Sequence, residues 1–471
     1  MLLSIIAAQD LELEQMDVKT AFLHGHLEER IYMEQPPDFR DPGLEGKVCL
    51  LQKSLYGLKQ SPRQWYKRFD SYVRSIGLFR CEFDPCVYVQ SLEDGSRVFL
   101  LLYVDDMLIA CKSRKVVQDL KASLSREFEM KDLGPARKIL GMEIFRDRAR
   151  RVLHLSQGGY IQKVLERFGM KGAKLVELPL AGHFRLSKTM APQTEVEAQE
   201  METVPYASGV GSLMYAMVCC RPDIAHAVSQ VSRFMAQPGR EHWRALKWIF
   251  RYLVGSVGVG ICYGQRGGAV GYSDMSREAQ GLIGGYVDAD FDGDVDTRRS
   301  TTGFIFSLYG GPISWRSSLQ PITTLSTTEA EYIGLTEVAK EAIWLKGLLT
   351  KMGLTQEAIR VHCDSQSALL LAQNSVYHAR TKYIDIRYHR IRELVEDGEV
   401  KLVKVHTKEN PADALTKVLP WDSFQRCVEL IRLMDRVELV EALGHQGGDC
   451  CDPGGVPKAQ GTKAKAKVHH S

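Results

Sequence analysis

The chain has 471 residues, with 61 Lys and Arg against 58 Asp and Glu, which gives a formal net charge of +3. This length is enough for roughly three domains. The 44% hydrophobic and 25% charged residues are ordinary for a globular protein. Near-neutral charge excludes a protein that binds nucleic acid by bulk charge alone, although a local basic groove remains compatible with it.

Three features of the sequence bear on its location. No apolar run approaches the ~20 residues that cross a bilayer. The opening M-L-L-S-I-I-A-A is short, lacks the basic start of a signal peptide, and resembles the end of a helix. Eleven cysteines without CxxC pairs fit reduced thiols better than a disulfide framework. We therefore expect an intracellular protein, cytoplasmic or nuclear, that is neither secreted nor bound to a membrane.

The first third of the chain predicts a sheet with two helices. Asp94-Gly95 is a strong hairpin signal between two strands, and a helix begins near Pro62, where proline suits the first turn. The expected strands are 10–18, 85–90, 97–104 and 107–111, with a further hairpin over 139–156, and residues 47–56 hold a second apolar stretch. A second helix is expected over about 113–128.

After residue 156, the pattern of apolar and polar residues changes twice along the chain. Helical periodicity over 157–169 and 205–254 flanks a polar, irregular stretch over 181–204 that reads as a linker. The elements expected after it are strands 283–291, 303–309 and 312–316, helix 327–350, strand 359–364, helices 365–373 and 383–397, strand 400–406 and a final helical stretch. Three strands followed by alternating helix and strand indicate a mixed α/β sheet with helices on its faces.

Two adjacent aspartates, Asp105 and Asp106, interrupt the apolar run R-V-F-L-L-L-Y-V-D-D-M-L-I-A-C. Burying two unpaired carboxylates is expensive. One interpretation is a hairpin turn, where Asp is common. Another is a divalent cation bound by hard oxygen ligands. Asp17 ends an earlier strand, and if it meets the pair, the cluster needs cations and two of them could catalyse phosphoryl transfer. Alternatively, Asp17 caps a loop.

Three motifs in order carry a resemblance to a known family. Q-M-D-V-K-T-A-F-L-H-G, K-S-L-Y-G-L-K-Q-S-P-R-Q-W-Y and Y-V-D-D-M-L together resemble the reverse transcriptase of copia-type LTR retrotransposon polyproteins, especially those of plants. Further matching blocks are K-D-L-G-P-A-R-K-I-L-G-M-E-I, G-S-L-M-Y-A-M-V and R-P-D-I-A-H-A-V. The resemblance covers roughly residues 1–440, so we expect the C-terminal part of such a polyprotein.

The resemblance implies a role for each matching residue of the front half. Asp17, Asp105 and Asp106 match metal-binding aspartates of the polymerase palm. Phe22 matches the residue beneath the sugar of the incoming nucleotide, where its ring would reject a ribose 2′-OH. The segment beside the nascent base pair is matched by Tyr56 and Gly57, and the basic residue near the leaving pyrophosphate by Lys131. Without the motif, Phe22 reads as a core residue, Gly57 as a turn and Lys131 as a solvated lysine.

The rear half carries a second set of acidic residues. Asp288 and Asp364 each end an apolar strand, in Y-V-D and V-H-C-D. In S-T-T-E-A-E-Y, Ser326 and Glu329 form a capping box, which leaves Glu331 free to face the sheet. Asp413 follows N-P-A, the start of a helix, where it could instead stabilise the helix dipole.

This second set resembles a ribonuclease H site. The matching signatures are V-D-A-D, S-T-T-E-A-E-Y, C-D-S-Q-S-A and H-T-K-E-N-P-A-D-A-L-T-K. The resemblance gives Asp288, Glu331, Asp364 and Asp413 the role of ligands to two divalent cations. His406 matches a mobile histidine that aids proton transfer or product release, although a lone histidine is more often a surface or cap residue.

The resemblance also implies the domain order and the partners. The fold expected is α+β or mixed α/β: a polymerase palm over 1–156 with the fingers missing, a thumb and connection over 157–282 with the linker about 181–204, a ribonuclease H-like domain over 283–440, and a disordered basic tail over 444–471. The chain starts sixteen residues before Asp17, so we expect weak polymerase activity.

The cofactors expected are Mg²⁺ or Mn²⁺, two per site. The partners expected are an RNA–DNA hybrid, an RNA template, a DNA primer and dNTPs, with no membrane. Arg380 and Lys382 are candidate phosphate contacts or members of a solvated face. The alternative function is an inactive relic that binds nucleic acid or only folds.

Overall fold

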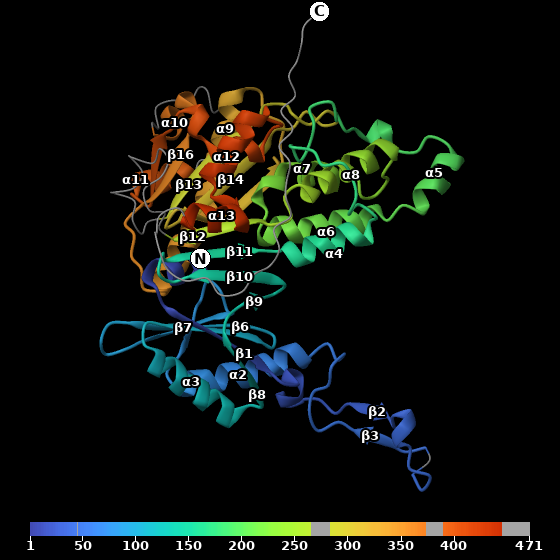
Figure 1. Ribbon diagram of the computed structural model, residues 1–471, viewed down its shortest axis with the longest axis vertical. Coiled ribbons are helices and arrows are strands. Elements are labelled where there is room, and N and C mark those ends of the chain that lie inside the picture. The colour runs from blue at the N-terminus through green and yellow to red at the C-terminus, as the bar shows by residue number, and fades with distance from the viewer. Residues whose placement is uncertain (45, 265–282, 374–389, 445–471) are drawn as a thin grey trace, which may run out of the picture.

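The computed structural model describes residues 1–44, 46–264, 283–373 and 390–444. Its first sheet has the strand order β4-β5-β6-β7-β1-β8. The strands are β1 (Glu12–Val18), β4 (Phe79–Arg80), β5 (Val87–Ser91), β6 (Arg97–Tyr103), β7 (Asp106–Cys111) and β8 (Met130–Pro135). Helices α2 (Ser61–Ser75) and α3 (Arg114–Glu127) lie together along this sheet (Figure 1). The apolar face of α2 (Trp65, Phe69) packs with Leu100, Ile109 and Leu124, which holds the sheet beneath both helices.

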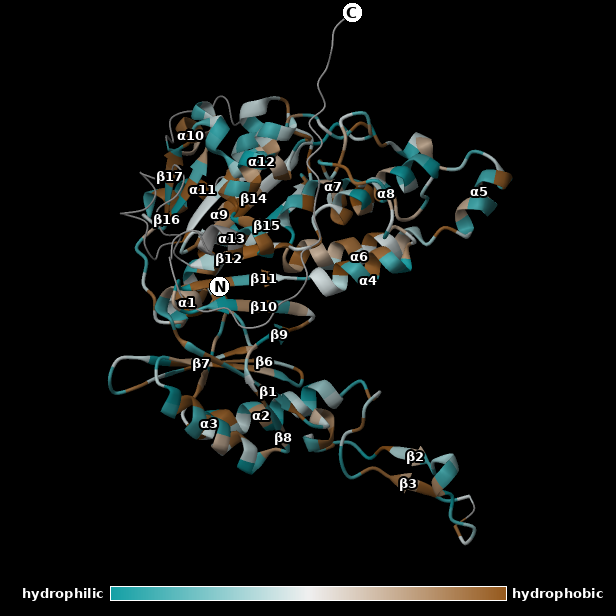
Figure 2. Cartoon of the chain, viewed as in Figure 1, coloured by the Kyte–Doolittle hydropathy of each residue, from teal (hydrophilic) through white to brown (hydrophobic). Residues whose placement is uncertain are grey.

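A thin ribbon projects away from this sheet (Figure 1). It pairs β2 (Tyr32–Glu34) with β3 (Val48–Leu50), so part of the apolar stretch over 47–56 forms a short strand. The short helices η1 (Ala21–His24) and η2 (Pro37–Phe39) lie before each of its two strands. Figure 2 shows apolar residues along β3, and Val48 and Leu50 are exposed.

A second sheet joins three distant parts of the chain in the order β18-β12-β11-β10-β9. Its strands are β9 (Lys138–Ile139), β10 (Met142–Asp147), β11 (Val152–Ser156), β12 (Val259–Gly264) and β18 (Leu433–Asp435). The opening helix α1 (Leu2–Gln9) packs on β11 and β12, as the apolar opening of the chain indicated. The hairpin expected over 139–156 is present as β10 and β11, but it pairs with β12 and lies outside the first sheet.

Helices fill the middle of the chain beside this sheet (Figure 1). They are α4 (Gly158–Arg167), η3 (Lys188–Met190), α5 (Glu195–Glu202), α6 (Tyr206–Cys219), η4 (Pro222–Ile224), α7 (Ala225–Ser232) and α8 (Arg240–Val254). The stretch 181–204, expected as an irregular linker, contains η3 and α5. Thr194 caps α5 by accepting a hydrogen bond from the Glu197 N–H at 3.2 Å, which explains a helix in so polar a sequence.

The third sheet has the order β15-β14-β13-β16-β17. Its strands are β13 (Gly284–Ala289), β14 (Thr301–Leu308), β15 (Gly311–Leu319), β16 (Ile359–Cys363) and β17 (Val400–Lys404), antiparallel among the first three and parallel from β13 through β16 to β17. The surrounding helices are α9 (Thr327–Lys351), α10 (Gln366–Gln373), α11 (Arg390–Glu396), η7 (Thr407–Glu409), η8 (Pro411–Leu415), α12 (Trp421–Leu430) and α13 (Arg436–Gly444). The mixed α/β fold expected from the sequence is confirmed. The range 383–397, expected as a helix, lies partly outside the described residues. Arg380, Lys382 and the tail after residue 444 lie wholly outside them.

The first and third sheets touch through the loop before β5. The Trp344 indole N–H of α9 donates to the Phe83 carbonyl at 3.2 Å, and Lys351 pairs with Glu82 at 2.8 Å. The Phe83 ring fills the space at Gly347, where an added Cβ would lie 2.1 Å from it. The two halves of the chain are therefore in direct contact. Within the described residues, no helix is long and apolar enough to span a bilayer.

Two candidate acidic metal centres

The rear cluster gathers carboxylates from four separate elements. Asp288 lies near the end of β13, Asp364 directly follows β16, and Asp413 lies in η8. Asp288, Asp364 and Asp413 each offer a carboxylate oxygen, and these oxygens lie within 4.8 Å of one another. The carboxyl ends of the parallel neighbours β13 and β16 meet at one sheet edge, which is why residues so far apart in sequence converge.

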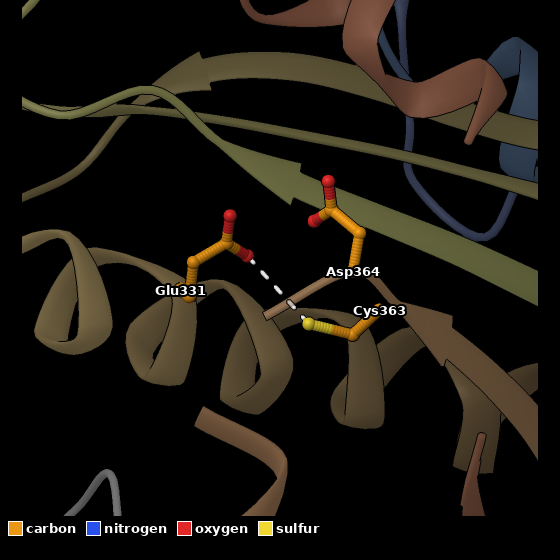
Figure 3. A group of neighbouring side chains, drawn as sticks. All are labelled: Glu331, Cys363 and Asp364. Carbon is orange, nitrogen blue, oxygen red and sulfur yellow. Dashed lines mark hydrogen bonds between the residues drawn. The ribbon is translucent and has the colours of Figure 1, made fainter. Parts of the chain in front are cut away.

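Glu331 reaches the same cluster from α9, as Figure 3 shows. Its Oε2 accepts a hydrogen bond from the Cys363 thiol at 3.7 Å, beside Asp364 (Figure 3). Ser326 caps α9 as expected, because its hydroxyl accepts from the Glu329 N–H at 3.2 Å. The Glu329 carboxylate accepts from the N–H of Leu325 rather than from that of Ser326, so the expected capping box is displaced by one residue. Glu329 is thereby occupied at the helix start, and Glu331 faces the sheet.

Burial and mutual repulsion set the electrostatics of the rear cluster. Asp288, Glu331 and Asp413 are only 2%, 7% and 8% exposed. Burial and the neighbouring charges of Asp288 and Asp364 raise the pKa of Glu331 well above its ordinary value. The same causes raise the pKa of Asp413 to about 7, against the attraction of Lys417. The pKa values are raised because the carboxylates are buried close to one another, and Lys417 does not fully offset their negative charge.

Two polar residues that sequence reasoning missed also contact this cluster. The Thr416 hydroxyl donates to Asp288 Oδ2, and Lys417 Nζ lies 3.4 Å from both Asp288 Oδ2 and Asp413 Oδ1. A signal for Lys417 was present, because it follows Asp413 by four residues and so returns to the same side of a helical turn.

The other aspartates of the 290–296 loop have protein partners instead. Asp292 pairs with Arg298, Asp294 with Arg233 at 2.9 Å, and Asp296 accepts from the Ser187 hydroxyl at 2.6 Å. These three aspartates are therefore neutralised or hydrogen-bonded by side chains of the protein itself. Two of these contacts tie the third sheet to the helical middle of the chain.

His406 lies between β17 and Asp413 along the chain. It is exposed at the start of η7, where its Nδ1 accepts a hydrogen bond from the Lys408 N–H at 3.2 Å. This is the capping position that the sequence offered as the simpler alternative. Asn410 caps the next short helix, as expected, by accepting from the Ala412 N–H at 3.2 Å.

The front carboxylates come together through strand register. Asp17 on β1 pairs with Asp106 on β7 on one side and with Lys131 on β8 on the other. Directly opposed residues in a sheet project to the same face, so Lys131, Asp17 and Asp106 form a row across three strands. Burial and the charges of Asp105 and Asp17 raise the pKa of Asp106. The alternative in which Asp17 caps a distant loop is not what the structure shows.

The turn beside these aspartates is strained. Tyr103 pairs with Asp106, so Val104 and Asp105 form a two-residue hairpin loop. Val104 has φ of 60°, which is rare for a β-branched residue. The Trp65 indole N–H donates to the Val104 carbonyl at 2.6 Å, and the Val18 N–H donates to the Asp105 carbonyl at 3.0 Å. These two bonds hold the strained loop, an arrangement common at functional sites.

Further polar residues surround the front row. Gln15, two residues before Asp17 on the same face of β1, donates from Nε2 to Asp106 Oδ1 at 3.4 Å. A cavity of about 360 Å³ lies beside Asp106 and is lined by Gln15 and by the basic side chains of Arg137 and Lys138. Sequence reasoning missed all three, although the two-residue spacing of Gln15 from Asp17 was a usable signal.

Two of the expected nucleotide-contact residues lie together. The rings of Phe22 in η1 and Tyr56 have centroids 4.6 Å apart, and Phe22 is half-buried against the core beneath α2. Gly57 follows with φ of 96°, in the left-handed region that favours glycine, and nothing lies within 4 Å of an added Cβ. The backbone at Gly57 is therefore open to a ligand.

The two sites differ in how well their oxygens fit a divalent cation. In the rear cluster, Asp413 Oδ1 is buried and makes only the 3.4 Å ion pair to Lys417, so it has unused acceptor capacity. Oxygens within 4.8 Å of each other are the donor set that Mg²⁺ or Mn²⁺ takes. Among the residues that the structure describes, the three front carboxylates do not form such a close group. The rear cluster fits directly, and the front row supplies the same ligand type at wider spacing.

The chain is similar to proteins of known class. The family described as reverse transcriptase (RNA-dependent DNA polymerase) matches residues 1–182, the part that holds the front row. Among curated relatives, the retrovirus-related Pol polyprotein from transposon TNT 1-94 of Nicotiana tabacum is 56% identical over 430 residues, which are 91% of this chain and 31% of that protein. The Pol polyprotein from transposon RE1 of Arabidopsis thaliana is 39% identical over 88% of this chain and 27% of its own length.

A third relative is covered completely. The putative transposon Ty5-1 protein of Saccharomyces cerevisiae is 33% identical over 327 residues, which are 69% of this chain and all of that protein. The chain belongs to the copia-type retrotransposon Pol polyprotein family, near plant elements. It spans about a third of the length of the plant polyproteins it matches.

Among solved structures, ribonuclease H1 of the archaeon Halobacterium salinarum is 19% identical over 29% of this chain and 95% of its own, with a TM-score of 0.21. At this similarity the overlap carries no weight for function.

Proposed function

We propose that the chain is a reverse transcriptase–ribonuclease H fragment whose rear cluster hydrolyses RNA in RNA–DNA hybrids. The observation that carries this proposal is the convergence of Asp288, Asp364 and Asp413 within 4.8 Å, with Glu331 beside them. Four buried or half-buried carboxylates from four elements are too costly to gather for structure alone.

The rear residues would act as ligands and as fixed geometry. Asp288, Glu331, Asp364 and Asp413 would hold two Mg²⁺ or Mn²⁺ ions, which activate a water and stabilise the leaving oxygen when bound. The Thr416 hydroxyl holds Asp288 Oδ2, and the Cys363 thiol holds Glu331 Oε2, so both carboxylates are oriented before metal or substrate arrives. Substrate choice would rest on hybrid geometry and 2′-OH groups rather than on base sequence.

A second function, RNA-directed DNA synthesis, is supported by the front row. We propose that Asp17, Asp105 and Asp106 hold the metals for nucleotide addition, that Lys131 faces the pyrophosphate, and that Phe22 and Tyr56 contact the incoming nucleotide. This proposal is supported by the strand register, in which Asp17 pairs with both Asp106 and Lys131. Its partners would be an RNA template, a DNA primer and dNTPs.

The three parts of the chain would work on a common substrate. The palm over 1–156, the thumb and connection over 157–282 and the ribonuclease H-like part over 283–440 act on one nucleic acid inside the cell, in the cytoplasm or the nucleus. His406 would assist product release from its exposed position beside η7.

Cleavage of an end-labelled RNA–DNA hybrid tests the main proposal. We expect fragments of the RNA strand with Mg²⁺ or Mn²⁺, none with EDTA, and no cleavage of the DNA strand or of single-stranded RNA. A chain that folds but leaves the hybrid intact with either metal would identify an inactive relic. Primer extension on an RNA template, measured on the same preparation, tests the front row separately.

A further inference from the structure

One cationic side chain already stands inside the rear cluster. Lys417 Nζ lies 3.4 Å from Asp288 Oδ2 and 3.4 Å from Asp413 Oδ1, so it bridges two of the carboxylates proposed as metal ligands. Its side chain is 40% exposed, whereas those of Asp288 and Asp413 are 3% and 11% exposed. Lys417 thus enters from the solvent side of a buried anionic group.

The position of Lys417 within the fold is fixed by its neighbours in sequence. Thr416, directly before it, is fully buried, and its single hydroxyl proton is shared between Asp288 Oδ2 and the Asp413 carbonyl, the latter at 3.1 Å. The Lys417 N–H donates to the Asp413 carbonyl at 3.3 Å. The backbone of Lys417 is therefore anchored to the ligand-bearing turn, while its long side chain extends from partly exposed surface to the two carboxylates.

We propose that Lys417 is the built-in counter-ion of the rear cluster and competes with divalent metal for Asp288 and Asp413. Without metal, its ammonium offsets part of the repulsion among the carboxylates. When metal binds, the same two carboxylates turn to it, and the ammonium moves toward solvent or shares them at a cost in metal affinity. Lys417 is thus a positioning residue that trades metal affinity for order in the metal-free protein.

This role, which rests on the proposed metal centre, differs from that of an ordinary structural ion pair. A structural pair would stabilise the metal-free and metal-bound forms equally. A competing counter-ion stabilises only the metal-free form, because the metal replaces its charge. Removing it should therefore lower stability in EDTA and tighten metal binding at once, two changes of opposite sign that a structural residue does not produce.

The test measures Mn²⁺ affinity by calorimetry and the melting temperature in EDTA and in Mn²⁺ for the full chain and for Lys417→Met. We expect a lower melting temperature in EDTA, a larger rise on adding Mn²⁺, and Mn²⁺ binding at least about tenfold tighter. The last figure follows from removing one unit charge about 5 Å from a divalent ion in a solvent-like dielectric.

Two further variants serve as controls for the Lys417→Met measurements. Lys417→Arg keeps the charge and should keep an affinity near that of the parent. Lys340→Met removes an exposed lysine of α9, nine residues after Glu331, that pairs with Glu337 at 2.7 Å, and it should change neither affinity nor the metal-induced shift.

The Mn²⁺ affinities of the parent and the variants distinguish failure of the counter-ion role from failure of the metal centre. Unchanged or weaker Mn²⁺ binding in Lys417→Met, with the parent binding normally, would overturn the counter-ion role and leave the proposed function standing. If Lys417→Met does not fold, a loss of affinity in Lys417→Gln overturns the role and a gain supports it. A parent that binds no Mn²⁺ would overturn the metal centre and this inference together.

Discussion

The two acidic sites of this chain are assembled by different means. The rear carboxylates come from the ends of neighbouring parallel strands and from two helices, lie deep in the protein, and have a lysine and a threonine built in beside them. The front carboxylates face each other across paired antiparallel strands, remain half-buried, and depend on a strained two-residue turn. A buried cluster is pre-assembled by the fold, whereas a half-buried row keeps room for a ligand to complete it.

The largest expected effect separates the sites by activity. We predict that Asp364→Asn lowers hybrid cleavage by at least about 1,000-fold, since it removes a ligand that stabilises charge in the transition state. Folding should survive, because Asp364 is half-buried and Asn keeps its shape. The assay is hybrid cleavage on protein whose circular dichroism matches that of the parent.

A matched variant completes this test. Asp106→Asn should leave hybrid cleavage intact and reduce only primer extension. Equal cleavage by Asp364→Asn and parent would remove Asp364 from the rear site.

Stability in EDTA should reveal the difference in burial. The raised pKa of Asp413, about 7, means that between about pH 4 and pH 7 the folded protein holds a proton that the unfolded chain has released. The free energy of unfolding therefore falls as pH rises through this window, by as much as about 1.4 kcal/mol per unit of pKa difference. Melting temperatures from pH 5 to pH 8 should decrease, and Asp413→Asn should flatten that decrease.

The front row supplies the comparison for this titration. The pKa of Asp106 is also raised, but from a half-buried position, so Asp106→Asn should flatten the decrease less than Asp413→Asn does. A larger effect from Asp106→Asn would reverse our ranking of the two sites.

Whether the sites act as one body depends on the contact between the sheets. Gly347 lies in α9, and helical Gly→Ala substitutions normally stabilise by about 1 kcal/mol. Here the new Cβ would lie 2.1 Å from the Phe83 ring, so we predict that Gly347→Ala destabilises by about 1–3 kcal/mol and exposes the loop before β5 to protease. Differential scanning calorimetry and limited proteolysis measure both.

Two controls isolate that contact. Gly211→Ala, in a helix where nothing lies within 4 Å of an added Cβ, should be neutral or stabilising. Combining Phe83→Ala with Gly347→Ala should restore part of the loss. Additive losses in the double variant would show that Phe83 is not what the Cβ meets.

Most residues of the rear cluster, and some of those around the front carboxylates, could be predicted from the sequence. Asp288 and Asp364 were predictable because strand ends in a mixed sheet share an edge, and Glu331 because Ser326 capped the helix and occupied Glu329. Thr416 was missed because a hydroxyl carries no sign of burial, and Lys417 because its four-residue spacing from Asp413 becomes informative only once a helical turn at Asp413 is assumed. The pairing of β11 with β12 joins residues about 110 positions apart, and local periodicity holds no information on such partners.

The smallest effect concerns the strained turn of the front row. Val104 has φ of 60° and a side chain that is 41% exposed. A glycine there would relieve about 1 kcal/mol of strain and lose a similar amount through the entropy of the unfolded chain, so Val104→Gly should change the free energy of unfolding by less than about 1 kcal/mol. A matched Val48→Gly, at an exposed strand position, should cost more, because that backbone is unstrained. Urea denaturation measures both, and a large loss at Val104 would mean that its side chain, rather than the bonds from Trp65 and Val18, holds the two aspartates in place.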